Sequence, residues 1–236
     1  YYHRLFWNKK HYTEEEILNA LQLITLDDIK NYSDNLYERV FISGVAHGNW
    51  TDKDVVDGIG TLLSEIKSSP LPEQDRFKDE IKTLEPGKYV RFSKKIKDSN
   101  NSMAYTLQLG EYSLENQAKA SFIADIIESD FYLQMRTNQQ LGYIVWSFNQ
   151  RMEDRLFLRF VIQSGTYGPF DLSKRVEEWF NSSGDLFENL SDETFENHRK
   201  SLIVDLEKKA NSIAEVAGEI FYLATEEKGN FKMKKQ

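Results

Sequence analysis

The chain has 236 residues, enough for one large domain or two smaller ones, and 40% of them are hydrophobic, which is ample for a packed core. Its formal net charge of −8 argues against a nucleic-acid-binding surface and fits a soluble protein. The lack of cysteine excludes disulfides and thiolate metal sites, and no apolar run approaches the roughly 18–20 residues that span a bilayer. We therefore expect neither nucleic acid nor a membrane among its partners.

Residues 1–37 are predicted to be purely helical. A capping box at Thr13–Glu16 marks the start of the first helix, because the threonine hydroxyl and the glutamate carboxylate can each accept a hydrogen bond from the other residue's backbone amide. A second helix is predicted over about residues 26–37, where leucine and isoleucine recur at helical spacing. We interpret residues 1–37 as the helical tail of a preceding domain.

Residues 38–236 show a different pattern, in which strands and helices alternate. The predicted elements, in chain order, are a strand over 39–45, a helix over 51–68, strands over 88–93 and 104–109, a long helix after Ser113, strands over 144–148 and 156–163, helices that begin near Pro169 and Ser191, and a last helical stretch from Ile213. Two hairpins separated by a long helix imply antiparallel pairing, with the helices on one face of the sheet. We therefore predict an α+β domain over residues 38–236, with the order β-α-β-β-α-β-β-α-α.

The corner at residues 131–147 carries the strongest functional signal in the chain. An amphipathic helix ends there in a polar, glycine-containing turn and passes directly into an apolar strand, with Arg136 and Tyr143 at the two edges of the turn. The guanidinium offers a fixed fork of donors and the phenol offers a hydroxyl, a pair suited to gripping a peptide carbonyl or an oxyanion. A structural role is the alternative, with Arg136 pairing with the last helix carbonyls and Tyr143 half-buried at a strand edge.

No other part of the sequence indicates a catalytic or metal centre. The four histidines form no H-E-x-x-H or H-x-x-E-H motif, so a solvent-facing or capping role fits each of them: His3, His11, His47 and His198. No G-x-S-x-G elbow, P-loop or G-x-G-x-x-G loop is present. Asp125 and Glu128 lie one helical turn apart and fit a solvated helix face better than an acid–base pair. We predict no catalytic residue and no metal ligand in this chain.

Residues 135–145 resemble the R-T-x-x-Q-L-G-Y-x-V signature in the C-terminal half of the insulin-degrading enzyme and pitrilysin family, the zinc peptidases with the inverted H-x-x-E-H motif. Other segments resemble the family in the same order, namely His47-Gly48-Asn49 after a strand, residues 159–164 and residues 173–180. For His47-Gly48-Asn49, a simple turn is the alternative explanation. The resemblance spans roughly residues 1–225 and places the chain at the end of the third and most of the fourth homologous domain.

This resemblance implies that the chain is a piece of a longer parent protein, with its last domain incomplete at the C-terminus. In the family, the zinc ligands and the general base lie in the N-terminal half, and the C-terminal half closes over them to form a chamber. Tyr143 would then donate a hydrogen bond to a substrate carbonyl near the scissile bond, and Arg136 would support it or bind the substrate backbone. The implied partners are peptide substrates and the N-terminal half of the same chain, and a homo-oligomer stays open.

Two alternatives of other classes stay open at this point. Some homologues of these peptidases are degenerate scaffold or assembly subunits, and a scaffold can lack the H-x-x-E-H motif. A free-standing peptide-binding module is the third possibility. The compartment is open between the bacterial periplasm, where pitrilysin-like members are often found, and the cytoplasm.

Overall fold

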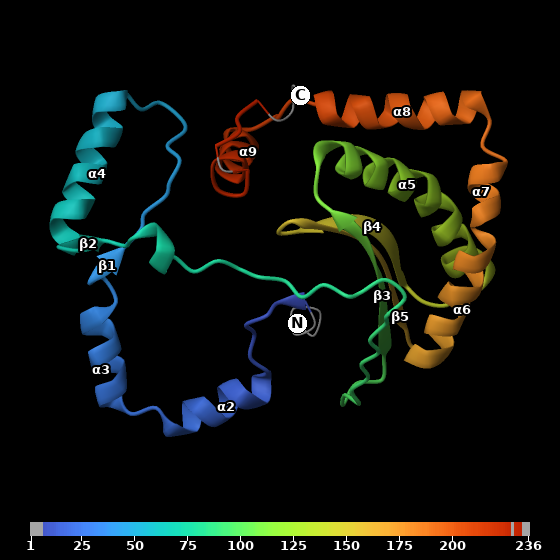
Figure 1. The fold of residues 1–236 in the computed structure, drawn as a ribbon, viewed down its shortest axis with the longest axis horizontal. Coiled ribbons are helices and arrows are strands. Elements are labelled where there is room, and N and C mark those ends of the chain that lie inside the picture. The colour runs from blue at the N-terminus through green and yellow to red at the C-terminus, as the bar shows by residue number, and fades with distance from the viewer. Residues whose placement is uncertain (1–6, 228, 233–236) are drawn as a thin grey trace. The chain divides into compact units, whose positions relative to one another are not determined.

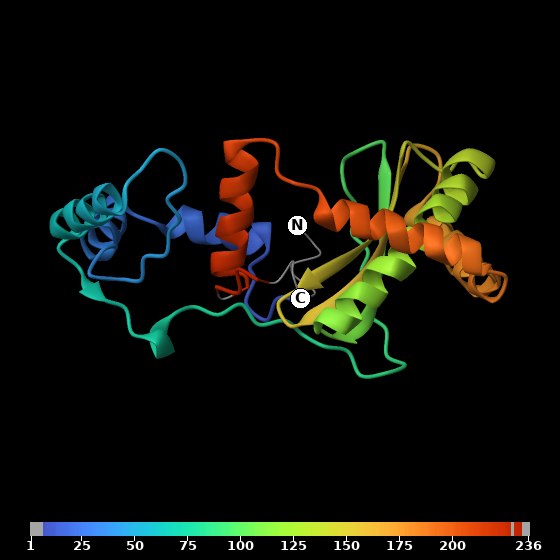
Figure 2. The same ribbon diagram turned by 90° about the horizontal axis from the view of Figure 1, so that it is seen from above.

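The computed structural model describes residues 7–227 and 229–232, which fall into two compact units (Figures 1 and 2). The first unit comprises Lys10–Asp79 and the described residues from Leu206 onward, and the second comprises residues 7–9 and Glu80–Asp205. This division follows contacts within the chain and does not test the domain boundary predicted near residue 37, which stays a prediction. Within the described ranges, no helix is both long enough and apolar enough to cross a membrane.

The second unit is built on an antiparallel sheet with the strand order β3-β5-β4. The strands are β3 (Asn101–Glu111), β4 (Ile144–Met152) and β5 (Arg155–Ser164), and Ile162 of the central strand lies between Met103 and Val145. Its helices are α5 (Leu114–Tyr132), α6 (Pro169–Ser182), α7 (Gly184–Glu188) and α8 (Asp192–Glu207). The predicted α+β class, with an antiparallel sheet and helices, is confirmed.

Helices α5 and α6 pack on one face of this sheet (Figure 1). Phe131 of α5, Phe160 of β5 and Trp179 of α6 form an aromatic cluster with ring centroids 4.9–5.4 Å apart. The alternation predicted for β5 is present, because Leu156, Leu158, Phe160 and Ile162 are all buried toward the helices. The opposite face is only partly covered, although Phe157 is buried there against Trp7. The core therefore lies between β5 and the helices, and it fixes α5 and α6 on the sheet.

The first unit consists mainly of short helices. They are α2 (Glu14–Leu23), α3 (Leu26–Asn35), α4 (Asp52–Ile66) and α9 (Ile213–Thr225), with a 3-10 turn, η1 (Glu73–Asp75), and two short parallel strands, β1 (Arg39–Val40) and β2 (Ser69–Pro70). No described residue of α2, α3 or α4 is buried, and most of their apolar side chains are exposed. These three helices are stabilised mainly at their ends.

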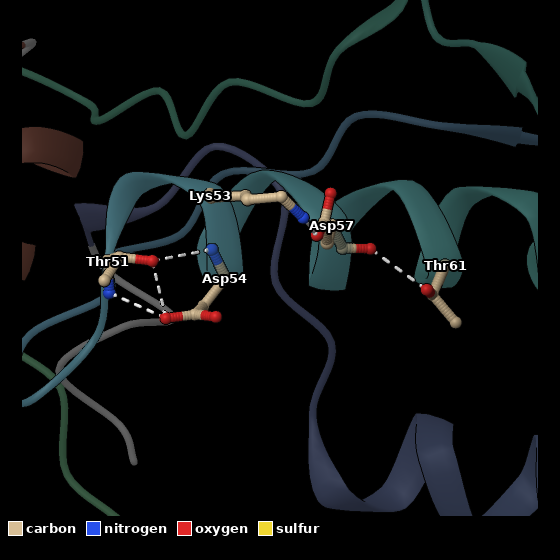
Figure 3. A network of polar contacts seen from close by, with 5 residues as sticks. All are labelled: Thr51, Lys53, Asp54, Asp57 and Thr61. Carbon is tan, nitrogen blue, oxygen red and sulfur yellow. Dashed lines mark hydrogen bonds and ion pairs between the residues drawn. The ribbon is translucent and has the colours of Figure 1, made fainter.

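A reciprocal capping box begins each of α2, α3 and α4. At α4, the Thr51 hydroxyl accepts from the Asp54 amide at 3.2 Å, and the Asp54 carboxylate accepts from the Thr51 amide at 2.9 Å (Figure 3). Lys53, in the first turn of α4, pairs with Asp57, whose carbonyl accepts a hydrogen bond from Thr61 (Figure 3). The box predicted at Thr13–Glu16 has the same geometry and is confirmed.

Two of the predicted strands differ from the structure. Residues 88–93 form no strand, and of the strand predicted over 39–45 only Arg39–Val40 is regular. Both segments have the apolar composition of strands, but Phe41, Val90 and Phe92 are at least half exposed. A strand needs a partner that supplies its hydrogen bonds, and the long polar run after residue 93 cannot act as the tight turn that aligns a hairpin. Apolar composition alone therefore predicted more strand than these two segments form.

Candidate functional site

The corner that contains Arg136 and Tyr143 begins where α5 widens into a π-helical turn, η2 (Leu133–Asn138). The Gln139 amide donates to the Gln134 carbonyl at 3.0 Å, which is the spacing of five residues that defines such a turn. Phe131 and Met135 are fully buried on the inner side of the segment. These two buried side chains therefore fix the backbone on both sides of the start of η2. They also fix the backbone position of Arg136, which follows Met135 directly.

The exit from the turn is fixed by three successive residues. Gln140 has a left-handed φ of 50°, the conformation that ends many helices. Leu141 is buried, and its amide donates to the Met135 carbonyl at 2.9 Å. At Gly142 a Cβ atom would lie 1.8 Å from the backbone oxygen of Gln163, so the chain can pass β5 at this distance only with glycine. The backbone that enters β4 is thus closely constrained.

The structure brings Arg136 and Tyr143 together. The guanidinium carbon of Arg136 lies 5.3 Å from the centroid of the Tyr143 ring, which is a cation–π arrangement. The Tyr143 side chain is 85% exposed, so this tyrosine is not half-buried as its structural alternative supposed. A charged donor and a phenol hydroxyl are therefore presented side by side on a rigid support, and both can face a ligand.

Helix α6 supports the same corner from the side. The Arg175 guanidinium donates to the Gln139 side-chain oxygen at 3.0 Å, and it also pairs with Asp171 at 3.3 Å. Its guanidinium carbon lies 4.7 Å from the centroid of the Tyr167 ring. Because Leu172 and Val176 on either side of Arg175 are fully buried, α6 is a firm base for this contact. This support could not be predicted from the sequence, since Gln139 and Arg175 are far apart in the chain.

A second polar contact that the sequence did not reveal joins α8 to α5. His198 and Asp125 approach to 2.6 Å between the imidazole Nδ1 and a carboxylate oxygen, and both side chains are partly buried. Phe195 of α8 packs on Phe122 of α5 with ring centroids 4.7 Å apart. His198 is therefore neither a solvent-facing nor a capping residue, and Asp125 is not fully solvated. This pair attaches α8 to the helical layer.

The remaining predicted features are turns or lie elsewhere. Gly48 has a φ of 139°, so the His47-Gly48-Asn49 segment contains the backbone conformation of a glycine turn. His3 lies outside the described residues. Across residues 7–227 and 229–232, no group of three or more His, Asp or Glu side chains is placed to hold a metal ion. The corner can thus donate hydrogen bonds and offer a positive charge, which suits binding of a carbonyl or an anion.

The corner lies in a part of the chain that matches a known protein family. Residues 122–221 match the family described as PQQ synthase PqqF-like, C-terminal lobe domain 4. The chain is 31% identical over 212 residues to a nardilysin-like protein of Arabidopsis thaliana, and the alignment covers 87% of this chain and 21% of that protein. It is 30% identical over 224 residues to the insulin-degrading enzyme of Homo sapiens, with 92% of this chain and 22% of that protein covered. The chain thus spans about a fifth of the length of these relatives.

A solved structure supports the fold. A crystal structure of pitrilysin superposes with a TM-score of 0.77, covering 95% of this chain and 24% of that chain at 18% sequence identity. At that identity the likeness concerns the fold alone. The family match names a C-terminal lobe domain, and the sequence relatives and the shared fold support the same assignment of this chain.

Proposed function

Since the chain belongs to the C-terminal region of the insulin-degrading enzyme and pitrilysin family of zinc peptidases, we propose that it is a non-catalytic, substrate-binding part of a zinc metalloendopeptidase. The observation that carries this proposal is the placement of Arg136 beside the exposed Tyr143 on the braced corner. Its substrates would be peptides or small unfolded proteins enclosed between this region and the N-terminal half of the parent protein.

The corner would act by donating hydrogen bonds to the substrate. The Tyr143 hydroxyl would donate to a substrate carbonyl near the scissile bond, and Arg136 would hold the phenol ring in place and bind the substrate backbone. A donor fixed before the reaction stabilises the negative charge that develops on that oxygen in the transition state. The described residues of this chain do not fit a zinc ion. The zinc ligands and the general base would therefore have to come from another part of the parent.

This proposal is tested by Tyr143→Phe in the full-length parent. Removing the hydroxyl keeps the ring next to Arg136 but deletes the donor, so we expect kcat/KM for a fluorogenic peptide to fall about 100-fold. The zinc content, measured by metal analysis of the same sample, should not change. Tyr89→Phe is a matched control, because Tyr89 is an equally exposed tyrosine of the same unit that lies outside the corner. A wild-type rate for Tyr143→Phe would show that the corner does not act on the substrate.

A further inference from the structure

Arg159 is a cation on the open face of the sheet, which is the face of β3, β5 and β4 that points away from α5 and α6. Its neighbours in β5, Leu158 and Phe160, are buried toward the helices, so Arg159 between them points to the opposite side. Arg159 is only partly buried there, and its diagonal neighbours Trp146 of β4 and Ala104 of β3 are exposed. A ligand can therefore reach this part of the sheet from both sides of β5.

No side chain around Arg159 on the open face neutralises its charge. The side chains opposite and diagonal to it on the two neighbouring strands are all uncharged, namely Ala104, Thr106, Gln108, Trp146, Phe148 and Gln150. The two side chains of the same face that flank it along β5 are apolar. Among the described residues, Arg159 makes no ion pair. The register of the sheet thus surrounds this guanidinium with neutral groups.

The guanidinium keeps donors that are not used. Nη1 donates to the side-chain oxygen of Gln150 at 2.9 Å, and the guanidinium carbon lies 5.6 Å from the centroid of the Phe148 ring. These are the contacts of the Arg159 side chain with the described residues. Nε is enclosed, but Nη2 is not, so both N–H groups of Nη2 are accessible and have no partner in that part of the chain. The Gln150 and Phe148 contacts hold the group in place while this end stays open.

A cation that is partly removed from water without a counter-ion costs free energy. Burial lowers the pKa of the Arg159 guanidinium, and no neighbouring charge contributes to that change. Arginine nevertheless stays protonated in proteins, so the charge is present at neutral pH. A carboxylate compensates such a charge best, because its two oxygens match the planar donors of the guanidinium. The surroundings of Arg159 therefore favour a carboxylate supplied from outside the described residues.

We propose that Arg159 binds the carboxylate of an acidic side chain in a peptide that lies extended across the open face. Arg159 is in the middle of the central strand and is more buried than Trp146 and Ala104 around it. A side chain can reach down to it while the peptide backbone stays above, whereas a chain end would bring the backbone itself down. The apolar surfaces of Trp146 and Phe148 would contact the side chains next to the acidic one.

This inference rests on the proposed function and deepens it, because it names an acidic side chain as a feature of the substrate. Phe148, which lies opposite Arg159, is five positions after Tyr143 in β4 (143 to 148), about 17 Å along a strand. An extended peptide covers that distance with about five residues. The acidic residue would therefore lie about five residues from the carbonyl that Tyr143 holds.

A titration with two peptides that differ in one charge tests the proposal. Both are acetylated and amidated heptapeptides of the same alanine, serine and leucine sequence, with glutamate or glutamine at the centre, and each is added to the 15N-labelled 236-residue chain. The glutamate peptide should bind at least about tenfold more tightly, the effect of one charge-assisted hydrogen bond, and should shift the Nε signal of Arg159. Because the whole chain carries a net charge of −8, a preference for the acidic peptide has to come from a local site.

Two variants provide the protein side of the same test. Arg159→Met removes the charge and keeps an unbranched side chain, so the two peptides should bind it equally. Arg155→Met is the matched control, because Arg155 lies on the same face of β5 but already pairs with Glu111 at 2.8 Å. It should keep the preference for glutamate.

Three results would overturn the proposal. The first is equal affinity of the wild type for the two peptides, or a preference that persists in Arg159→Met. The second is a glutamine peptide with a free C-terminal carboxylate that binds as tightly as the capped glutamate peptide, because the site would then recognise a chain end. The third is equal affinity together with a lower melting temperature of the full-length parent in Arg159→Met, which would assign the guanidinium to a carboxylate of the parent.

Failure of this inference can be told apart from failure of the proposed function. The titration measures binding to this chain and needs neither zinc nor cleavage. A wild-type rate for Tyr143→Phe together with a glutamate preference that depends on Arg159 would remove the catalytic support but keep the carboxylate site. A reduced rate for Tyr143→Phe with equal affinities for the two peptides would do the opposite.

Discussion

Gly142 shows how strongly a single residue constrains the corner. Its Cα faces the backbone of β5 so closely that no side chain fits, and the next residue is the exposed Tyr143. The glycine is required here by space, because its φ is not in the left-handed region. The position of the Tyr143 hydroxyl therefore depends on a neighbour that itself carries no functional group.

Gly142→Ala should destabilise the protein by about 2–3 kcal/mol, because the obstructing atoms belong to backbone that cannot rotate away. Urea unfolding followed by circular dichroism measures this free energy of unfolding. Gly165→Ala is the control, since a Cβ at that position would make an ordinary 3.5 Å contact with the Asn100 side chain and should change stability by less than about 0.5 kcal/mol. Equal stability of the two variants would contradict the close approach.

The sequence predicted Arg136 and Tyr143 as candidate site residues, but it did not predict the contact between them. They are seven positions apart and lie on different elements, so no single regular periodicity predicts that the guanidinium lies over the ring. The contact forms across the π-helical turn and the residues that lead from it to β4, and a turn of that kind leaves no clear mark in the sequence. The pair His198–Asp125 was missed for a different reason, because tertiary packing alone brings residues 73 positions apart into contact.

Among the elements, α6 has a role beyond filling the core. It carries Arg175, which holds the Gln139 side chain of the corner, while its neighbours Leu172 and Val176 anchor the helix. Three contacts therefore hold the corner. They are the buried side chains at the end of α5, the close approach of Gly142 to β5, and the hydrogen bond from Arg175 of α6 to Gln139.

Loss of the α6 support should loosen the corner without unfolding the sheet. In Arg175→Ala we expect amide exchange of residues 137–142 to become about tenfold faster, the equivalent of one hydrogen bond, while exchange in β5 stays as in the wild type. Exchange followed by NMR resolves both regions. Lys174→Ala is the matched control on the same helix, because its ammonium pairs with Glu178 on the surface. Unchanged exchange in Arg175→Ala would mean that the contact does not restrain the corner.

The capping box of α4 makes a prediction about pH. Hydrogen bonds from the Thr51 hydroxyl and then from its amide lower the pKa of the Asp54 carboxyl below its ordinary value of 3.8. A carboxyl with a lowered pKa stabilises the folded helix above the ordinary value, and that stabilisation is lost as the pH falls through the lowered value. Thr51→Ala should return the pKa of Asp54 toward 3.8, as seen in an NMR titration of the carboxyl carbon. An Asp54 pKa that stays low in the variant would contradict the capping contact.

The elements most easily predicted were those whose signals are local. Capping residues and apolar periodicity located α2, α4 and α5, and alternation located β5, because each depends on neighbours in the chain. The segment 88–93 has the same local composition but no strand partner, and partners are set by the whole fold. The correct predictions are thus those that depend on neighbours in the sequence. The incorrect ones are strands that need a partner from elsewhere in the fold.

For the whole molecule, the two units differ in how they are stabilised. The second unit encloses an aromatic core between helices and sheet. In the first unit, α2, α3 and α4 bury no described residue and expose apolar side chains such as Leu18, Ile29 and Ile59. Isolated short helices are marginal in water, and the chain spans about a fifth of its relatives' length. We expect these faces to be covered by other parts of the parent.

Limited proteolysis of the 236-residue chain should distinguish the units. Trypsin is expected to cut within residues 10–79 at least about tenfold faster than within residues 80–205, because α2, α3 and α4 open without exposing a core. Lys53 and Lys119 are a matched pair of sites, since each is exposed on a helix and pairs with an acid one turn away. Mass spectrometry gives the order of cleavage. Equal rates at the two lysines would show that the first unit is as stable as the second.

The π-helical turn also limits how this region can change in length. It contains one residue more per turn than the α-helix that precedes it. Phe131 and Gly142 are both fixed, by the core and by the close approach to β5, so a one-residue deletion in η2 would have to be absorbed between them and would change the position of Arg136 relative to Tyr143. In homologous proteins that use this corner, we therefore expect the number of residues between Phe131 and Gly142 to be kept.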